Sequence, residues 1–179
     1  MKRLALLVVV VVAITALLPV LRPAAERVWF LYTLATRPVP THLPNPVAAA
    51  RAPRMTDSWS AARSAGRRHE GIDIFAPKGT PVVSTTPGVV TRIGENRLGG
   101  QFVGVLGPGL EWHYYAHLDR FGSFREGDIV NAGDVLGYVG NTGNARGTAP
   151  HLHYGIYKGG AKNPYPRLTA DRAALEAAD

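Results

Sequence analysis

The chain has 179 residues and a formal net charge of +7, which is enough for one domain of ordinary size and a short extension but not for two large domains. With 46% hydrophobic residues, 18% charged residues and 20 glycines, the composition excludes a disordered chain and favours strands joined by tight turns. Since the sequence contains no cysteine, disulfides, cysteine-ligated metals and cysteine nucleophiles are excluded, and any bound metal has to use His, Asp or Glu.

The first element in chain order is an apolar run from Leu4 to Leu21, preceded by two basic residues. Its length is close to what a helix needs to cross a bilayer, so we expect residues 1–25 to form a transmembrane anchor or signal segment. An uncleaved anchor is favoured, because Arg22 and Pro23 follow the run where a signal peptidase requires small residues. These features predict a cell-envelope protein held in the inner membrane by its N-terminal helix, with the rest of the chain in the periplasm or otherwise outside the cytoplasm.

Residues 26–56 are expected to be a juxtamembrane segment and a linker rich in Pro, Ala and Arg. Val28 to Leu34 is too short to span a membrane, and both an interfacial segment and a short packed helix remain open for it. From Arg37 to Arg54, repeated prolines remove backbone donors and fix φ, which predicts a tether. His42 lies in this tether, and we expect a solvated side chain there rather than a ligand.

Beyond residue 57, short runs rich in Val, Ile and aromatic residues alternate with Gly and Asn turns, the pattern of an antiparallel β domain. The expected strands are 81–84, 88–93, 102–106, 110–118, 129–130 and 135–139. Gly107-Pro108-Gly109 predicts a hairpin between the third and fourth of these, and the turn at 131–134 predicts that the last two also pair. The domain is expected to cover residues 57–168, followed by a short helix or tail at 169–179.

Several histidines and one aspartate have the spacing of metal ligands. His69 and Asp73 are four residues apart, which keeps both side chains on one side of an extended or a helical segment. His151 and His153 flank Leu152, so on a strand the two imidazoles share a face. Two neutral imidazoles and one carboxylate suit Zn²⁺ and leave the fourth tetrahedral position to water, which is a catalytic rather than a structural arrangement.

The segment 112–118, WHYYAHL, supplies a further histidine for chemistry. Strand alternation predicts that His113, Tyr115 and His117 share one face, opposite the face of Trp112 and Tyr114. An imidazole near neutral pH can accept a proton from an activated water or donate one to an oxyanion, and His117 is the candidate for such a role. His113 is a second candidate, although a half-exposed strand position explains it equally simply.

At these residues the sequence resembles the lysostaphin-type, or LytM-like, zinc metallopeptidases, which cut peptide bridges in bacterial peptidoglycan. The similarity covers about residues 57–168, with matching segments GRRHEGIDIFAPKGTPV at 66–82, YAHL at 115–118, GDIVNAGDVLG at 127–137 and GNTGNARGTAPHLHY at 140–154. It implies that His69, Asp73 and His153 bind Zn²⁺, and that His117 and His151 form the catalytic pair, with the division of their roles open.

The same resemblance implies a mainly β fold: an antiparallel LytM-like sheet of the duplicated-hybrid-motif type, following the membrane helix and the Pro-rich tether, with the metal at the floor of a groove. One position departs from the family pattern, because Gly155 stands where relatives often carry a larger residue, and this leaves the wall of the groove undefined. Among the surface arginines, Arg68 and Arg146 are candidates for binding carboxylates of the substrate.

Together these features predict a zinc-dependent metalloendopeptidase that hydrolyses peptide cross-links of peptidoglycan, with the stem peptides as its partner in binding. The alternative is a non-catalytic LytM-like regulator that activates a cell-wall amidase, but such a protein is expected to lack part of the His and Asp set. A biotinyl-type carrier is disfavoured, because no lysine of the domain has the expected flanks. No nucleic-acid partner is expected, whereas a regulatory envelope protein stays open as a partner.

Overall fold

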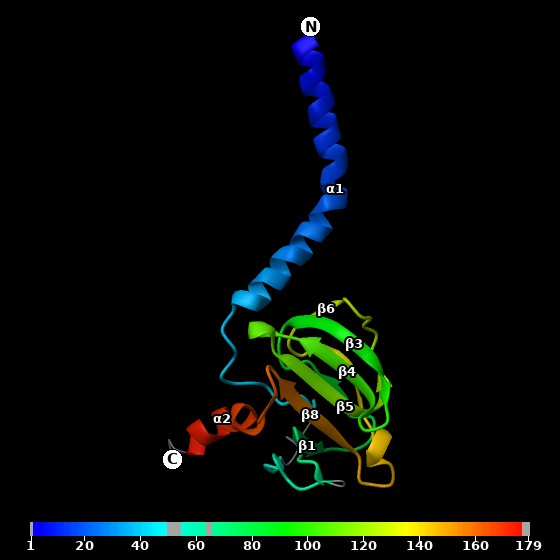
Figure 1. Ribbon diagram of the computed structural model, residues 1–179, viewed down its shortest axis with the longest axis vertical. Helices are drawn as coiled ribbons and strands as arrows, with labels where there is room; N and C mark the ends of the chain where they lie inside the picture. The colour runs from blue at the N-terminus through cyan, green and yellow to red at the C-terminus, as the bar shows by residue number, and fades with distance from the viewer. Residues whose placement is uncertain (1, 50–54, 64–65, 177–179) are drawn as a thin grey trace. The chain divides into compact units, whose positions relative to one another are not determined.

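The structure is a computed structural model that describes residues 2–49, 55–63 and 66–176, with side chains described between residues 15 and 170 of these ranges. The chain divides into two compact units, Met1–Arg37 and Pro38–Asp179. The first unit is a helix, and the second contains the strands (Figure 1). Each unit is described by itself below. The division of the sequence into the four parts 1–25, 26–56, 57–168 and 169–179 stays a prediction.

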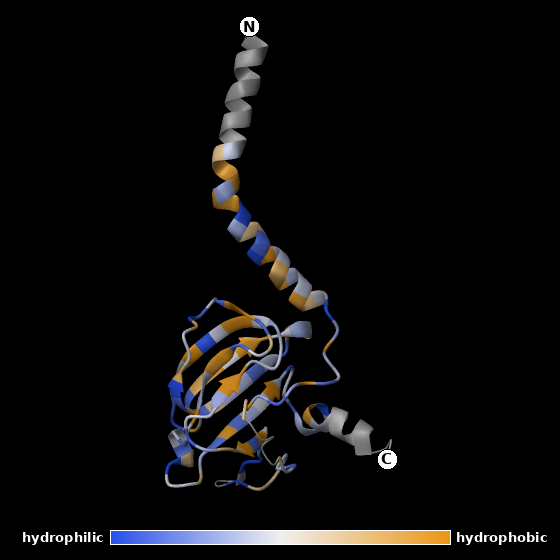
Figure 2. Cartoon of the chain, turned by 180° about the vertical axis from the view of Figure 1, so that it is seen from behind, coloured by the Kyte–Doolittle hydropathy of each residue, from blue (hydrophilic) through white to orange (hydrophobic). Residues whose placement is uncertain are grey.

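Helix α1 (Lys2–Thr36) contains two prolines and, in its second half, an ion pair between Arg22 Nε and Glu26 Oε1 at 2.8 Å. Figure 2 shows hydrophilic residues interrupting the hydrophobic ones along its described side chains. Among the residues that the structure describes, no helix combines the length and the hydropathy that a membrane span requires. The predicted location, which depends on this helix holding the chain in the inner membrane, is therefore wrong. The side chains of residues 1–14, which make up much of the predicted span, lie outside the described ones.

Residues 38–49 belong to the second unit and pack on it, although the prolines of this segment predicted a tether. Leu43 and Val47 are buried in the core, and Val47 forms an isolated antiparallel bridge with Val82. The backbone N–H of Leu43 donates to the carbonyl of Arg167 at 2.9 Å. Buried apolar side chains and backbone pairing thus hold this segment against the sheet, while residues 50–54 of the predicted tether lie outside the described residues.

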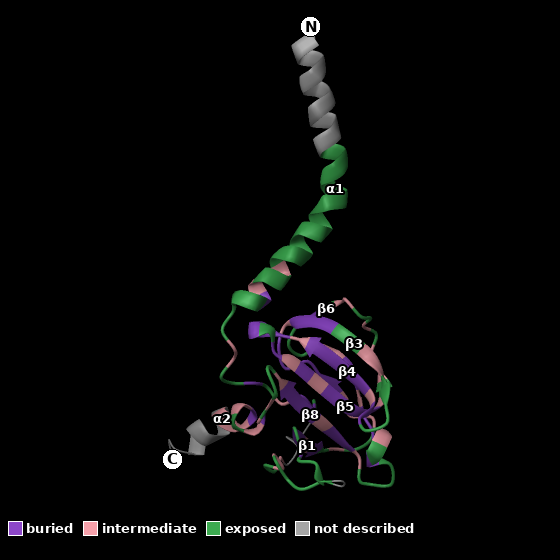
Figure 3. Ribbon diagram, viewed as in Figure 1, coloured by how far each residue is buried: buried purple, intermediate pink, exposed green. Residues whose placement is uncertain are grey.

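Nine strands of the described chain form one antiparallel sheet, which confirms the mainly β prediction. They are β1 (Ile72–Phe75), β2 (Pro81–Val83), β3 (Gly88–Asn96), β4 (Gly100–Leu106), β5 (Trp112–Phe121), β6 (Ile129–Val130), β7 (Val135–Val139), β8 (His151–Tyr157) and β9 (Ala161–Lys162). The main order is β1-β8-β5-β4-β3-β6, while β7 joins β2 to β5 and β9 pairs with β8. Figure 3 shows that β4 and β8 carry mostly buried residues, and β5 is buried in its middle part, from Tyr115 to Leu118, so the centre of the sheet lies against the core.

The predicted hairpin of β4 and β5 is confirmed, since Val105 lies opposite His113 and a short 3₁₀ turn, Pro108–Leu110, joins the strands. The predicted pairing of β6 with β7 is wrong: β6 pairs with β3, and β7 pairs with β2 and β5. The reason is the turn between them. Gly133 N–H donates to Ser84 O at 2.8 Å and Ser84 N–H donates to Asp134 O at 2.9 Å, so the turn pairs with the end of β2 instead of closing a hairpin.

Helix α2 (Tyr165–Glu176) begins four residues before the predicted C-terminal helix. Asn163 explains the earlier start, because its side-chain oxygen accepts the backbone N–H of Tyr165 at 2.9 Å and so satisfies a free donor of the first turn. The helix is fixed to the sheet by a partly buried ion pair, in which Arg167 Nη1 lies 2.7 Å from Glu111 Oε2. This contact places the first turn of α2 beside the start of β5.

Candidate metal centre and catalytic cleft

Strand pairing brings the predicted ligands together on one face of the sheet. Asp73 on β1 lies directly opposite His153 on β8, and Ala116 on β5 lies opposite the same histidine from the other side. His69 precedes β1 and is held by two antiparallel backbone bonds to Ser60 and Ala61. The sheet therefore converts residues 80 positions apart in sequence into neighbours.

The three side chains converge on one point. His69 Nε2 lies 2.9 Å from His153 Nδ1 and 3.1 Å from Asp73 Oδ1, and His153 Nδ1 lies 3.2 Å from the same Asp73 oxygen. Two ligands of a tetrahedral Zn²⁺ at the usual bond lengths are about 3.3 Å apart, so the three atoms already have nearly the required separation. The chemistry of the set also fits a cation, because His69 Nδ1–H donates to Ser58 O at 2.8 Å and leaves Nε2 of the neutral ring without a proton, facing a carboxylate oxygen.

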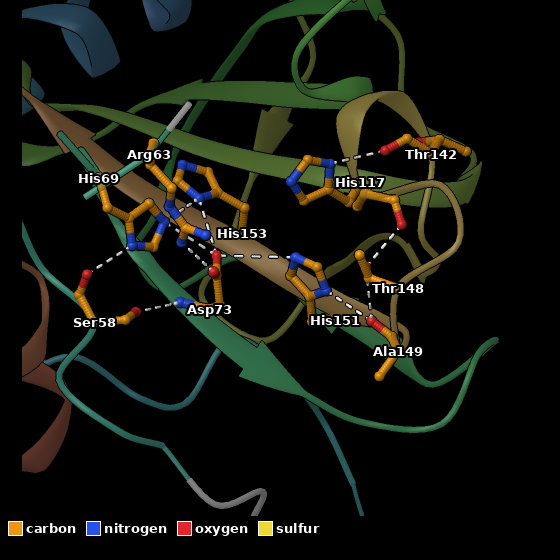
Figure 4. A network of polar contacts seen from close by, with 11 residues as sticks. Ser58, Arg63, His69, Asp73, His117, Thr142, Thr148, Ala149, His151 and His153 are labelled. Atoms are coloured by element: carbon orange, nitrogen blue, oxygen red, sulfur yellow. Dashed lines mark hydrogen bonds and ion pairs between the residues drawn. The ribbon is translucent and has the colours of Figure 1, made fainter. Parts of the chain in front are cut away.

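Two residues outside the predicted set hold the ligands in place (Figure 4). Ser58 contacts both: its carbonyl accepts the His69 Nδ1 proton, and its hydroxyl oxygen accepts the backbone N–H of Asp73 at 3.1 Å. Arg63 Nη2 donates to the second carboxylate oxygen, Asp73 Oδ2. Only Oδ1 of Asp73 is thus directed at the two imidazoles. Partners of this kind orient metal ligands and tune their affinity.

The surroundings of the three converging side chains keep the Asp73 carboxylate ionised and the His153 ring neutral. Burial is the largest single influence on the pKa of Asp73 and acts to raise it, but hydrogen bonding to His153 and His69 and the charges of both rings hold that pKa well below its usual value. For His153, burial is the largest influence, and together with the charges of His69 and Arg63 it lowers the pKa although Asp73 acts to raise it. The carboxylate is therefore ionised and the His153 ring neutral near neutral pH, which are the forms in which these groups bind a metal.

His117 and His151 stand beside the three converging side chains, with ring centroids 5.0 Å apart. Both rings are oriented in the same way: His117 Nδ1 donates to Thr142 O at 2.9 Å, and His151 Nδ1 donates to Ala149 O at 2.8 Å. In the neutral ring each Nε2 is then a proton acceptor, and that of His151 lies 4.0 Å from Asp73 Oδ1. Burial, followed by the charges of His153 and His151, lowers the pKa of His117 to about 4.

A bulge in β5 aims His117 into the site. From Tyr115 to Leu118 the strand advances three residues while β4 advances two, from Val103 to Gln101, so β5 carries one extra residue. His117 has a φ of 63°, in the left-handed region, and its N–H donates to Gly99 O at 2.7 Å. Bulges re-aim side chains in this way next to active sites, and the predicted simple alternation of β5 is wrong from this residue onward.

His113 lies in the core rather than in the site. Its side chain is fully buried, with Nδ1 2.7 Å from the Tyr154 hydroxyl and 3.3 Å from Thr85 Oγ1. Thr85 Oγ1 also contacts the hydroxyls of Tyr115 and Tyr154 at 2.9 and 2.8 Å. The predicted sharing of one face by His113, Tyr115 and His117 is therefore wrong. The face toward the cleft instead carries Trp112, Tyr114 and, after the bulge, His117.

These residues lie in a cleft of about 1380 Å³. Of the two arginines predicted as carboxylate binders, Arg68 lines this cleft and donates to Ser60 O at 3.1 Å, whereas Arg146 lies in a separate shallow depression. Arg63 was not predicted, and neither was Ser58. No sequence signal marks them, because Ser58 precedes His69 by 11 residues and only the fold brings it against two ligands.

Comparisons with known proteins relate the chain to one family of peptidases. The model of the family described as Peptidase family M23 matches residues 67–164, more than half of the chain. L-Ala--D-Glu endopeptidase of Bacillus subtilis (strain 168) is 45% identical over 126 residues, which is 63% of this chain and 39% of that protein. Glycyl-glycine endopeptidase ALE-1 of Staphylococcus capitis is 38% identical over 91 residues, or 50% of this chain and 24% of that protein.

Solved structures show the same fold. A putative glycyl-glycine endopeptidase lytM from Ruminococcus gnavus superposes with a TM-score of 0.61 at 36% identity, covering 79% of this chain and 63% of the other. The catalytic domain of lysostaphin from Staphylococcus simulans gives 0.58 at 28% identity, covering 64% of this chain and 90% of the other. The chain spans less than half the length of the curated relatives named above. Since the family model covers more than half of its residues, the chain belongs to peptidase family M23.

Proposed function

We propose that the chain is a zinc-dependent endopeptidase that hydrolyses peptide bonds of bacterial peptidoglycan. The observation that carries this proposal is the approach of His69 Nε2, Asp73 Oδ1 and His153 Nδ1 to within 3.2 Å of one another, beside His117 and His151. Membership of a family of peptidoglycan endopeptidases supports the substrate class. A zinc-containing peptidase from Vibrio cholerae with a TM-score of 0.55 supports the choice of metal.

In this proposal His69, Asp73 and His153 hold Zn²⁺, with Ser58 and Arg63 orienting the first two. The bound ion supplies Lewis acidity, which polarises the scissile carbonyl and makes an attacking water more acidic. Two imidazoles and a carboxylate leave one coordination position for reactants, as hydrolytic zinc sites require. The low pKa of Asp73 serves this role, because the carboxylate stays ionised over the whole physiological range.

His117 and His151 move the protons. Each ring keeps a proton on Nδ1, which donates a hydrogen bond to a backbone carbonyl, and turns Nε2 toward the cleft. We assign the acceptance of the water's proton to His117, because burial keeps its ring neutral and ready to act as a base. His117 then returns this proton to the leaving amine, and His151, when Nε2 carries a proton in addition to the one on Nδ1, donates a hydrogen bond to the developing oxyanion. The chain has all five residues of the proposed site, three ligands and two further histidines, and this favours hydrolysis over the role of a non-catalytic regulator.

The test is mass spectrometry of peptidoglycan fragments after incubation of purified sacculi with the full chain, with and without a chelator and added zinc. The proposal predicts cleavage that the chelator abolishes and zinc restores, and the masses of the products identify the bond. His151→Ala, which keeps the three proposed ligands, is expected to cleave at least about 100-fold more slowly. Undiminished cleavage in the chelator, or no cleavage by a folded and zinc-loaded chain, contradicts the proposal.

A further inference from the structure

Three of the aromatic side chains that line the cleft form a group next to the proposed metal ligands. Trp112 and Tyr114 come from β5 and Tyr157 from β8, and we call these three residues the aromatic floor. The ring centroid of Trp112 lies 5.2 Å from that of Tyr114 and 5.7 Å from that of Tyr157. The ring centroid of Tyr114 lies 6.1 Å from that of His153. Within the aromatic floor, Tyr114 is therefore the direct neighbour of His153, one of the proposed ligands. None of the chemistry described above uses it.

Glycines give these rings room to lie across the sheet. A Cβ at Gly104 would stand 2.6 Å from both Nε1 and Cζ2 of Trp112, and one at Gly155 would stand 2.9 Å from Cε2 of Tyr157. A Cβ at Gly99 would stand 3.0 Å from Cζ of Tyr114. Real Cβ contacts are essentially never shorter than 3.0 Å. Gly155, the departure from the family pattern, is thus the position that lets Tyr157 cover the strand.

Hydrogen bonds fix the rings and occupy their polar atoms. Trp112 Nε1 donates to Thr91 Oγ1 at 2.9 Å, the Tyr157 hydroxyl donates to Glu70 O at 3.2 Å, and the Tyr114 hydroxyl accepts from Asn96 Nδ2 at 3.1 Å. The planes of Trp112 and Tyr114 are 31° apart, whereas Tyr157 stands at 80° to Tyr114. The result is a group of three rings in the lining of the cleft, each with its polar atom bonded to another part of the chain.

We propose that the aromatic floor is a subsite for a sugar ring of the glycan strand, so that the cleft binds a peptide still attached to its sugar. This inference rests on the proposed function, because peptidoglycan is the substrate from which the occupant is chosen. The side chains of its stem peptides are short, aliphatic or charged, and its sugars are the only large rings with an apolar face. Aromatic side chains supply broad apolar contact with little loss of conformational entropy.

The rim of the cleft fits the polar edge of a sugar. Arg92 and Glu126 line the same cleft, and Glu126 is held there by the backbone N–H of Ile93, which donates to its Oε1 at 2.8 Å. Sites of this kind combine an apolar surface with a few placed polar groups that fix the orientation of the ligand. Hydroxyl and acetamido groups of a sugar have both the donors and the acceptors to bind an arginine and a carboxylate.

The test uses the disaccharide of N-acetylglucosamine and N-acetylmuramic acid without any peptide, titrated into the zinc-loaded full chain by calorimetry, with saturation-transfer NMR to identify the contacting protons. We expect the disaccharide to bind through its ring protons, and Trp112→Leu and Tyr157→Leu each to raise Kd at least about tenfold. Tyr138→Leu is the matched control, because Tyr138 is an aromatic residue of β7 that does not line the cleft. It is expected to leave Kd unchanged.

Absence of disaccharide binding to the wild-type chain overturns the inference, and so does a Kd that neither cleft variant changes. Circular dichroism checks the fold of each variant, and if one of the two does not fold, the other carries the test. The disaccharide contains no peptide bond, so the result does not depend on hydrolysis. Failure of the proposed function is seen separately, as uncleaved sacculi, while sacculus cleavage without disaccharide binding contradicts only the sugar subsite.

Discussion

The buried His113 ring gives a quantitative prediction for the pH dependence of stability. Its side chain is fully buried, and its Nε2 has no hydrogen-bond partner within the described part of the chain. Burial, followed by the positive charge of Arg167, lowers the pKa of His113 from 6.5 to about 3. Between pH 6.5 and pH 3 the His113 ring is therefore mostly neutral in the folded chain and mostly protonated in the unfolded chain.

The sign follows from linkage. Between these two pKa values the unfolded chain binds more protons than the folded chain, so the contribution of His113 to stability is present above pH 6.5 and is lost as the pH falls toward 3. At pH 5 the loss relative to pH 7 amounts to about 2 kcal/mol. This magnitude changes little if the folded pKa is higher by one unit, because at pH 5 it is set by protonation of the unfolded chain.

His113→Phe keeps the ring volume and removes the titration, so the variant is expected to lose about 2 kcal/mol less than the wild type between pH 7 and pH 5. Urea unfolding followed by tryptophan fluorescence at both pH values measures the difference. Both proteins keep His69, Asp73 and His153, so the proton and metal equilibria of the site cancel in the comparison. An equal loss of stability in the two proteins would refute the reasoning and show that His113 titrates normally in the folded chain.

Three further outcomes are expected. Ser58→Ala removes the acceptor of the Asp73 N–H and should weaken Zn²⁺ binding about tenfold in a chelator competition. His117→Ala, like the corresponding change at His151, should keep one zinc per chain and lower kcat/KM on peptidoglycan fragments at least about 100-fold. Glu111→Ala leaves the partly buried Arg167 without its ion-pair partner and should cost about 3 kcal/mol of unfolding free energy, measured in urea.

The first two of these outcomes have matched controls. Ser123→Ala changes an exposed serine of the loop after β5 and should leave zinc affinity as it is. His42→Ala removes an exposed histidine of the segment 38–49 and should leave kcat/KM as it is. Unchanged zinc affinity in Ser58→Ala, full activity in His117→Ala, or unchanged stability in Glu111→Ala would each contradict the corresponding contact as the cause.

The sequence anticipated the site better than the strand connections. His151 and His153 share a face because both lie on β8, a regular strand that keeps residues two positions apart on one side. His69 precedes β1 and is placed beside Asp73 by its backbone bonds to Ser60 and Ala61. His117 joins the same cluster for a reason that periodicity does not contain. One extra residue in β5 and a positive φ turn its ring to the face that simple alternation assigns to Tyr114.

Other features depend on contacts between distant segments. Ser58 reaches two proposed ligands only because residues 58–63 run antiparallel to the stretch around His69. The turn before β7 pairs with Ser84, which no local signal in the turn residues reveals. In the segment 38–49 the prolines predicted a free tether, but Leu43 and Val47 bury enough apolar surface to hold it on the core. In each case tertiary packing overrides a correct local observation.

The most direct test of the account is the zinc content of the purified full chain after dialysis, measured by inductively coupled plasma mass spectrometry together with the loss of zinc in His69→Ala, Asp73→Ala and His153→Ala. The account predicts one zinc per wild-type chain, less than a tenth of that in each of the three variants, and full occupancy in His117→Ala. A wild-type chain that takes up no zinc, or ligand variants that keep it, would contradict the metal centre on which the proposed function rests.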